Sequence, residues 1–391
     1  MDVPAIQRAL AAERLDGWLL YDFHGSNPIA QQLTGLAGGV HMTTRRWYYL
    51  IPAAGEPRAL VHAIEQHNLD HLPGSRIVYA GRQQLDTGLT ALLGRSKRVA
   101  MEYSPECAIP YVSRLDAGTA EAIRKRGVEI VSSGDLVQQF EATWSAAQLA
   151  THREAAAALY RIKDKAFEEA SRALTGGRRQ TEYDLQQLMV GWFQEEGLVS
   201  DAPPVVAIGA NAGNPHYLPT AEHNRVIVGD EVLLLDLWGK KAQPGAVFAD
   251  ITWVGATSGQ VPTEPAAAFA AIVRARDAAV RLVQERAVAG EDLRGWEVDR
   301  AARQVLDESG YSGHVLHRTG HSLGENVHGN GTHLDDYETH DERRLVPRTG
   351  FTVEPGLYFD SFGVRTEINV YRGERDAVVT GERQTAIVTL R

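Results

Sequence analysis

Four carboxylates and one imidazole near the C-terminus have the residue types and settings that could do chemistry. They are Asp236, Asp250, His321, Glu354 and Glu367. Each lies in a short apolar or glycine-marked segment, where a charged side chain is costly unless a partner binds it. Clustered carboxylates repel one another unless cations neutralise them. A pair of divalent metal ions bridged by some of these oxygens would do so, and two-metal sites hydrolyse amides, esters and phosphates.

The acids occur in two similar settings. Val232–Leu237 and Gly350–Pro355 are apolar strand-like segments that each contain one acid. Each is followed by a turn and by a second strand with another acid, after a nearly equal interval. Two such hairpins, facing each other about a pseudo-two-fold axis, would deliver their carboxylates to one point. We infer this from spacing alone, because the identity between the two segments is negligible.

The two aspartates have simpler explanations when each is taken alone. Asp236 interrupts an apolar run, and a strand-end aspartate that is hydrogen-bonded to a turn would explain it. Asp250 precedes a strand-like segment and would be a turn residue. On neighbouring strands, however, the two side chains would form a bridging pair.

His321 lies between Gly320 and Gly324, and glycines let the backbone come close to a bound group. A single histidine is more often structural than a ligand. His317 and His328 lie nearby in the sequence and favour a site.

Two glutamates end or interrupt strand-like segments. Pro355 follows Glu354 and cannot donate to a strand ladder, so this strand should end at the acid. Strand alternation places Arg365 and Glu367 on one face. The alternative for Arg365 and Glu367 is an ion pair on the surface, which would contribute little to stability.

Two further histidines are candidates for the reaction itself. His216 lies in the glycine-bearing loop 208–217, and loops held on a scaffold are where reactive groups concentrate. The alternative is a solvent-exposed loop histidine. His328 would face away from His321 if the chain between them is extended, unless that loop turns.

Composition limits the class of protein. The chain has 391 residues, which favours two domains, and 43% hydrophobic with 23% charged residues is typical of a globular protein. The formal net charge of −10 argues against nucleic acid or an anionic membrane as the main partner. No stretch approaches the ~20 apolar residues of a membrane span, and no signal-peptide pattern is present.

Cysteine usage agrees with a reducing compartment. Cys107 is the only cysteine, so an internal disulfide and a cysteine-based zinc site are excluded. A small inert hydrophobic side chain is favoured over a nucleophile at this position. We expect a cytoplasmic protein.

Hydrophobic periodicity divides the chain into two expected domains, 1–145 and 146–391. In the first, a helix over Val3–Leu15 and short apolar strands separated by helical segments predict an α/β domain. The strands are expected at Trp18–Tyr21, Trp47–Ile51, Ala59–His62, Arg76–Tyr79, Val99–Met101 and Val128–Val131.

The second domain is expected to pack helices against a curved antiparallel sheet, an α+β arrangement. Capping signals at Ser145 and Thr181 predict helices that run to about Leu174 and to Glu196. Further helices are expected at Pro265–Ala289 and Gly295–Glu308. The remainder, from Thr319 onward, is predicted to be mostly strand and turn.

The string LLLDLW…FADITW…HRTGHSLG…VHG…TVEPGLY…GVRTEI resembles the metallopeptidase family of methionine aminopeptidase, aminopeptidase P and prolidase, which has the pita-bread fold. The Xaa-Pro dipeptidase branch is the most similar. The match covers roughly residues 150–391 and is specific, because five ligand positions recur in order in matching contexts. The N-terminal third is similar, more weakly, to the smaller α/β domain of prolidases and creatinase.

The resemblance implies that Asp236, Asp250, His321, Glu354 and Glu367 bind two divalent metal ions. A carboxylate-rich set favours manganese, with cobalt or zinc as alternatives.

It also implies roles in catalysis. Glu354 would be both ligand and general base. His216 and His328 would stabilise the tetrahedral oxyanion. Arg365 would clamp the substrate carboxylate or orient the ligands.

One segment departs from the family pattern. Members usually have about ten residues between the two aspartates and a tyrosine three residues before the second. Here the segment is longer, and Val247 stands in the place of the tyrosine. This departure indicates a variant subgroup of the family, with an altered catalytic rate or an altered substrate.

We therefore expect a homodimeric Xaa-Pro dipeptidase that acts on small proline-containing peptides and has neither a nucleic-acid nor a membrane partner. One alternative is an aminopeptidase P, which releases the residue before proline from longer peptides. Another is a non-catalytic peptide-binding pita-bread module. The complete set of five ligands argues against that module and against a creatinase-like enzyme.

Overall fold

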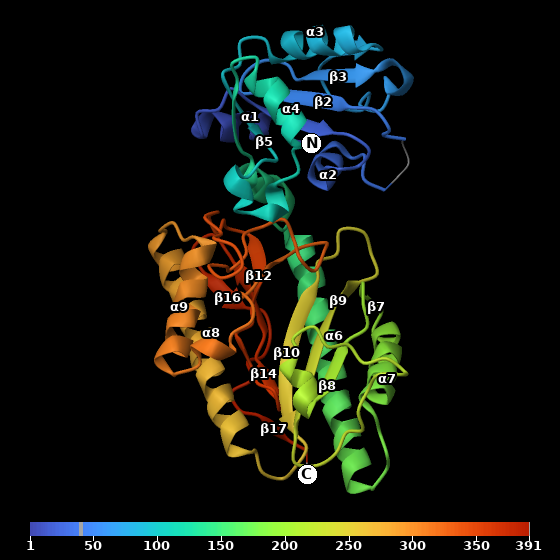
Figure 1. The fold of residues 1–391 in the computed structure, drawn as a ribbon, viewed down its shortest axis with the longest axis vertical. Helices are drawn as coiled ribbons and strands as arrows, with labels where there is room; N and C mark the ends of the chain where they lie inside the picture. Colours follow the sequence, from blue (N-terminus) through green and yellow to red (C-terminus); the bar gives the residue numbers. More distant parts are fainter. Residues whose placement is uncertain (39–41, 391) are drawn as a thin grey trace. The chain divides into compact units, whose positions relative to one another are not determined.

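The computed structural model describes residues 1–38 and 42–390, which form two compact units (Figure 1). The N-terminal unit is Met1–Glu141 and the C-terminal unit is Ala142–Arg391. The expected domains, 1–145 and 146–391, stay a prediction about how the chain folds. Each unit is described by itself below.

The N-terminal unit contains a mixed six-stranded sheet in the order β4-β3-β2-β1-β5-β6. β1 pairs antiparallel with β2, and β2 with β3, whereas the β1–β5, β5–β6 and β3–β4 pairs are parallel. The strands are β1 (Gly17–Asp22), β2 (Trp47–Pro52), β3 (Arg58–His62), β4 (Ser75–Tyr79), β5 (Arg98–Met101) and β6 (Glu129–Ser132). The helices are α1 (Val3–Ala12), α2 (Pro28–Thr34), α3 (Arg82–Leu93), α4 (Ala117–Arg124) and α5 (Gly134–Val137).

Both faces of this sheet are covered, which explains why its strands read as unbroken apolar runs. Along β1, Trp18 and Leu20 pack in one apolar cluster with side chains of α1 and α2. Leu19 and Tyr21 pack in a second cluster with side chains of α3 and α4. The predicted α/β organisation and strand positions are confirmed. The first helix ends at Ala12 rather than Leu15, because Arg14 adopts a left-handed conformation with φ of 54°.

The C-terminal unit packs helices against strongly paired strands, so the predicted α+β arrangement is confirmed (Figure 1). One sheet has the order β17-β10-β9-β7 with β8 also paired to β9, a second has the order β11-β12-β15-β16, and β13 pairs with β14. The strands are β7 (Leu198–Val199), β8 (Val205–Ile208), β9 (Val232–Lys241), β10 (Ala249–Ala256), β11 (Ser322–Leu323), β12 (Thr349–Val353), β13 (Gly356–Tyr358), β14 (Gly363–Arg365), β15 (Ile368–Arg372), β16 (Ala377–Val379) and β17 (Val388–Thr389).

Four long helices flank these strands, and two separate apolar clusters hold them in place. α6 (Ala146–Thr175) and α7 (Glu182–Glu195) share a cluster with β9 and β10. α8 (Thr263–Ala289) and α9 (Gly295–Glu308) share the other with β12, β14 and β15. The strands therefore lie between two helical layers, as Figure 1 shows for this unit.

The helix boundaries follow from local capping chemistry. The Ser145 hydroxyl accepts the amide of Gln148, and the Gln148 side chain accepts the amide of Ser145, as the predicted capping box requires. Thr181 opens α7 in the same way, and the bounds of α9 are as predicted. α8 begins at Thr263, before the expected Pro265, because proline is tolerated in a first turn, where its missing N–H has no partner to lose.

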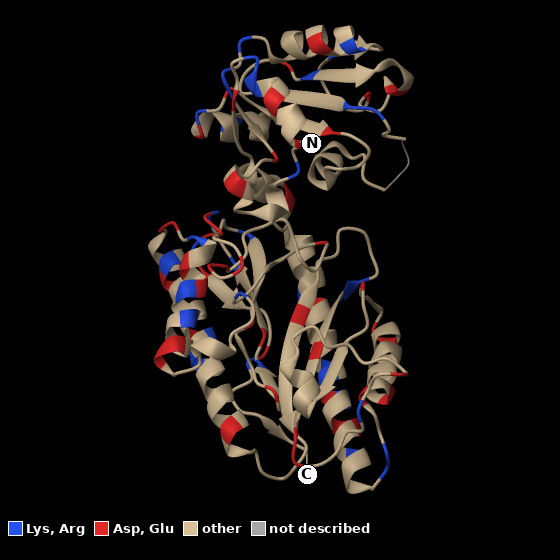
Figure 2. Ribbon diagram, in the orientation of Figure 1, with Lys and Arg blue, Asp and Glu red and all other residues tan. Residues whose placement is uncertain are grey.

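Figure 2 shows acidic positions on strands inside the C-terminal unit, as well as mixed charge on its helices. None of the helices formed by the described residues combines the length and apolar character needed to cross a bilayer. Carboxylates on strands between two helical layers are costly unless they are paired, and the geometry of these strands shows what they contact.

Candidate metal centre

The β9–β10 ladder places two aspartates on one face of the first hairpin. Asp236 pairs directly with Thr252, and Asp250 lies two residues before Thr252, so all three side chains share a face. The opposite face, with Leu235 and Ile251, packs in the α6–α7 cluster. Asp236 lies within β9 and Asp250 within β10, so the turn explanation for each aspartate is wrong.

Two glutamates lie at one end of the β12–β15 ladder. The expected simple turn between these strands is wrong, because the β13–β14 pair connects them, and β12 to β15 is called the second hairpin below. Val353 pairs with Ile368 as the terminal pair of this ladder. Glu354 comes directly after Val353, and Glu367 directly before Ile368. Because the next residues of both strands leave the ladder together, the two carboxylates emerge side by side.

Hydrogen bonds join the two hairpins at their acids. The amide of Asp250 donates to Asn369 Oδ1 at 3.0 Å. Thr252 Oγ1 donates to Glu367 Oε2 at 2.7 Å, and the amide of Glu367 donates to the Thr252 carbonyl at 3.2 Å. The structure therefore brings the carboxylates of both hairpins into one place.

His321 enters this place from the segment that leads into β11. Its amide donates to Thr352 Oγ1 and its carbonyl accepts the Thr352 amide, both at 2.9 Å. A side chain at Gly320 would collide with the Thr352 carbonyl, so this approach needs glycine. His321 Nε2 lies 3.5 Å from Asp250 Oδ2 and 3.4 Å from Glu354 Oε1.

The donor set fits divalent metal ions. One potential ligand atom from each of Asp250, His321 and Glu367 lies within 4.8 Å of the others, and all three residues are buried. Among the described residues, Asp250 Oδ1 and Glu367 Oε1 are buried without a hydrogen-bond partner. A buried carboxylate oxygen without a partner carries a desolvation penalty that a bound cation would remove. Oxygen ligands with one imidazole suit manganese, cobalt or zinc.

The pKa values of the clustered acids also favour a bound cation. Burial and the nearby carboxylate of Asp250 raise the pKa of Asp236 to about 7, against the opposing charge of Arg365. Burial and the Glu354 charge raise the pKa of Asp250 well above its ordinary value. Burial and the surrounding carboxylates do the same for the pKa of Glu367. These groups resist simultaneous ionisation until positive charge is supplied.

Glu354 differs from the other three acids. Burial raises its pKa, but His321, His317 and Arg365 outweigh that effect, so the pKa of Glu354 lies below its ordinary value. Its Oε1 accepts a hydrogen bond from Thr352 Oγ1 at 2.9 Å. Among these four acids, Glu354 is the one whose pKa lies below its ordinary value.

Arg365 is buried beside Asp236 rather than on the surface. Its Nη2 forms an ion pair with Asp236 Oδ2, its Nε donates to Thr252 Oγ1 at 2.9 Å, and its Nη1 donates to the Tyr358 hydroxyl at 3.0 Å. The alternative of a surface Arg365–Glu367 pair is wrong, since both residues are buried and Arg365 pairs with Asp236. The contacts favour the orienting role for Arg365 over the substrate clamp.

Thr252 and Tyr358 of this network were not named from the sequence, and His317 was noted there only as a neighbour of His321. Thr252 contacts Asp236, Glu367 and Arg365. The Tyr358 hydroxyl lies 2.6 Å from His317 Nε2. Strand alternation from Asp250 could have identified Thr252. No sequence pattern predicts the contact between the side chains of Tyr358 and His317.

The structure places the two loop histidines differently. The chain after His321 turns back, since the Gly329 amide donates to the Ser322 carbonyl at 2.7 Å, and the His328 ring lies edge-on to His321 with centroids 4.4 Å apart. His216 is exposed, and no hydrogen bond or ion pair in the described part of the chain links its side chain to the five clustered residues. Its catalytic role stays a prediction.

The loop of His216 is nevertheless anchored near Arg365. It follows the 3₁₀ segment η5 (Gly209–Gly213). A side chain at Gly213 would collide with the Phe359 carbonyl, and one at Gly363 with the Ala212 carbonyl. Because these backbones touch, the loop starts directly against the β13–β14 hairpin that carries Arg365.

Val247, which the resemblance aligns with a tyrosine position, is fully buried. It packs in an apolar cluster with Trp144, Phe248 and Leu323. Its amide donates to Thr151 Oγ1 at 3.2 Å. No phenol is available at this position.

Comparisons with known proteins agree with this geometry. The model of metallopeptidase family M24 matches residues 151–379. A probable dipeptidase PepE of Mycobacterium bovis is 28% identical over 254 residues, which cover 64% of this chain and 62% of that protein. A Xaa-Pro dipeptidase of Lactobacillus helveticus is 30% identical over 166 residues, which cover 42% of this chain and 40% of that protein. The chain thus spans less than two thirds of the length of these curated relatives.

Solved structures show the same fold. Dipeptidase PepE from Mycobacterium ulcerans matches with a TM-score of 0.71 at 22% identity, over 99% of this chain and 96% of that one. The prolidase from Pyrococcus horikoshii matches with a TM-score of 0.61 at 19% identity, over 98% of both chains. With its pita-bread fold and a family match over more than half its length, the chain belongs to metallopeptidase family M24.

Proposed function

We propose that this chain is a two-metal peptidase that hydrolyses the Xaa-Pro bond of dipeptides. The observation that carries the proposal is the convergence of Asp250, His321 and Glu367, two of which keep buried oxygens without partners among the described residues. The dipeptidase and prolidase names of the relatives support the substrate class.

The five clustered residues would hold two divalent ions, with manganese first and cobalt or zinc as alternatives. When bound, such ions acidify a water molecule and polarise the scissile carbonyl. The four carboxylates face one buried guanidinium, that of Arg365, so positive charge is needed before all of them can ionise.

Glu354 is proposed as the proton carrier. A pKa below the ordinary value favours the ionised carboxylate, which is the form that would accept a proton from the attacking water. Proline nitrogen must be protonated to leave, and Glu354 would return the same proton. Arg365 and Thr252 fix Asp236, so they maintain the ligand geometry rather than touch the reacting atoms.

Two histidines are proposed to bind the tetrahedral oxyanion. Burial and the positive surroundings of His321 and Arg318 lower the pKa of His328 to about 4, so the ring is neutral at pH 7 and can donate an N–H. His216 would approach from its anchored loop when substrate is present. We also propose a cytoplasmic homodimer, which the low cysteine usage and the family resemblance support.

A hydrolysis panel tests the proposal. Xaa-Pro dipeptides and Xaa-Pro tripeptides are offered to the protein with added manganese, and E354Q serves as the inactive control. Turnover of dipeptides alone supports the proposal. Turnover of tripeptides selects the aminopeptidase P alternative, and binding of peptides without any turnover selects the non-catalytic module.

A further inference from the structure

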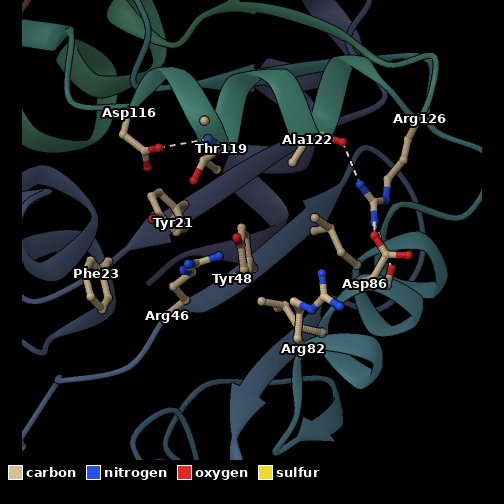
Figure 3. A pocket seen from close by; sticks show the side chains of 13 residues that line it. Tyr21, Phe23, Arg46, Tyr48, Arg82, Asp86, Asp116, Thr119, Ala122 and Arg126 are labelled. Carbon is tan, nitrogen blue, oxygen red and sulfur yellow. Dashed lines mark hydrogen bonds and ion pairs between the residues drawn. The ribbon is translucent and has the colours of Figure 1, made fainter.

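The N-terminal unit contains a cavity that the metal centre does not use. It lies between α3 and α4, above β1 and β2, and has a volume of about 490 Å³ (Figure 3). This volume is in the usual range for a small-molecule site. All the residues that line it belong to Met1–Glu141.

Two tyrosines form an aromatic floor. Tyr21 of β1 pairs directly with Tyr48 of β2, and their ring centroids are 4.9 Å apart. Leu85 and Leu89 of α3 add an apolar wall. The floor and the wall would cover an apolar side chain of a ligand.

Two arginines on exposed positions supply positive charge to this space. In the described part of the chain, neither the Arg46 nor the Arg82 guanidinium forms a hydrogen bond or an ion pair, although Arg46 Cζ lies 6.0 Å from the Phe23 ring centroid. Arg82 is the first residue of α3, where the helix dipole disfavours a cation. Arg126 is different, because it binds Asp86 and the Ala122 carbonyl and therefore has a structural role.

One carboxylate faces the same space. Asp116 caps α4, and its Oδ1 accepts the Thr119 amide at 2.8 Å. Burial raises the pKa of Asp116, but the hydrogen bonds from Thr119 and Tyr21 and the charge of Arg46 outweigh it and lower the pKa, so the group is ionised at neutral pH. Figure 3 shows Asp116 and Arg46 on the two sides of Tyr21.

These charges select among ligands. A simple anion at Arg46 and Arg82 would also meet the negative charge of Asp116, and a simple cation at Asp116 would meet Arg46. A molecule that carries both charges on neighbouring atoms satisfies both groups.

We propose that this cavity binds a zwitterion, namely a free α-amino acid with an apolar side chain. Arg46 and Arg82 bind its carboxylate, Asp116 binds its ammonium group, and the side chain lies on Tyr21 and Tyr48. None of the residues that line this cavity is a proposed ligand of the metal centre.

Calorimetric titration of the full-length protein with L-phenylalanine tests the proposal. 3-Phenylpropanoate, which lacks the ammonium group, and 2-phenylethylamine, which lacks the carboxylate, are the matched ligand controls. R46Q and D116N each remove one charge, and asparagine still caps a helix. R45Q removes the charge of a neighbouring arginine that does not line the cavity. Thermal unfolding verifies that each variant folds.

Hydrogen exchange with and without L-phenylalanine locates the bound molecule. The proposal expects saturable binding, protection of residues 82–89 and 116–122, and weakening by about tenfold or more in R46Q and D116N but not in R45Q. If 3-phenylpropanoate binds with the same affinity as L-phenylalanine, the ammonium group is not recognised and the proposal of a zwitterionic ligand is wrong. Absence of binding, binding that R46Q leaves unchanged, or protection confined to the metal cluster overturns the site itself.

Discussion

Replacing Thr252 with valine should weaken metal binding without touching any proposed ligand. The hydroxyl of Thr252 donates to Glu367 Oε2 at 2.7 Å and accepts from Arg365 Nε at 2.9 Å. Its side chain is fully buried, so water cannot replace the lost bonds. Valine has nearly the same shape, and the change therefore removes the hydroxyl while leaving the packing.

The size of the effect follows from those two bonds. Both involve a charged partner, and removing the hydroxyl leaves Glu367 and Arg365 each short of a hydrogen bond. Second-sphere losses of this kind typically weaken metal affinity by about 10- to 100-fold. That range corresponds to about 1.4–2.8 kcal/mol.

Manganese titration of the metal-free protein measures this loss, with activity recorded at saturating metal. T252S keeps the hydroxyl and should bind manganese almost as the parent does. If T252V binds manganese with the same affinity as the parent protein, the claim that Thr252 orients Glu367 and Arg365 for metal binding is refuted.

Four further outcomes are expected. E354Q should lower kcat by several orders of magnitude while metal remains bound, and a near-normal kcat would place the base elsewhere. A chelator should abolish peptidase activity, and manganese or cobalt should restore it, whereas turnover that persists in chelator would argue against metal chemistry. V247Y should lower the free energy of unfolding by about 1–3 kcal/mol because the site is fully packed, and metal content measured by elemental analysis should not change. Burial lowers the pKa of His152 to about 4, below its unfolded value near 6.5, so its stabilisation is complete above pH 6.5 and is lost as pH falls toward 4, by about 3 kcal/mol. Urea unfolding should show a shallower decline over this pH window in H152Q, and an identical decline would contradict the assignment.

The sequence predicts the acids of this site because strand periodicity constrains them. Alternation with period 2 places Asp236 and Asp250 on one face once their strands pair, and β12 ends at Val353, directly before Glu354 and Pro355. Helices α6 and α7 are predicted from their capping residues, because a capping box, like strand alternation, involves only residues that are close in the sequence.

Contacts between hairpins are not predictable in this way. The ion pair between Arg365 and Asp236 joins residues on different sheets, and only tertiary packing decides which acid Arg365 meets. The position of His328 depends on a loop that turns back at Gly329. No periodic pattern describes such a loop.

The long separation between the two hairpins has a consequence for how the protein matures. Helices α8 and α9 lie in the chain between β10 and β12, so a nascent or partly folded chain holds only one pair of acids. Such non-local closure is slow, since the entropy of ordering the intervening segment is lost before the contacts form. Ion capture should therefore be a late event in folding, and scarcity of metal would lower the abundance of folded protein as well as its turnover.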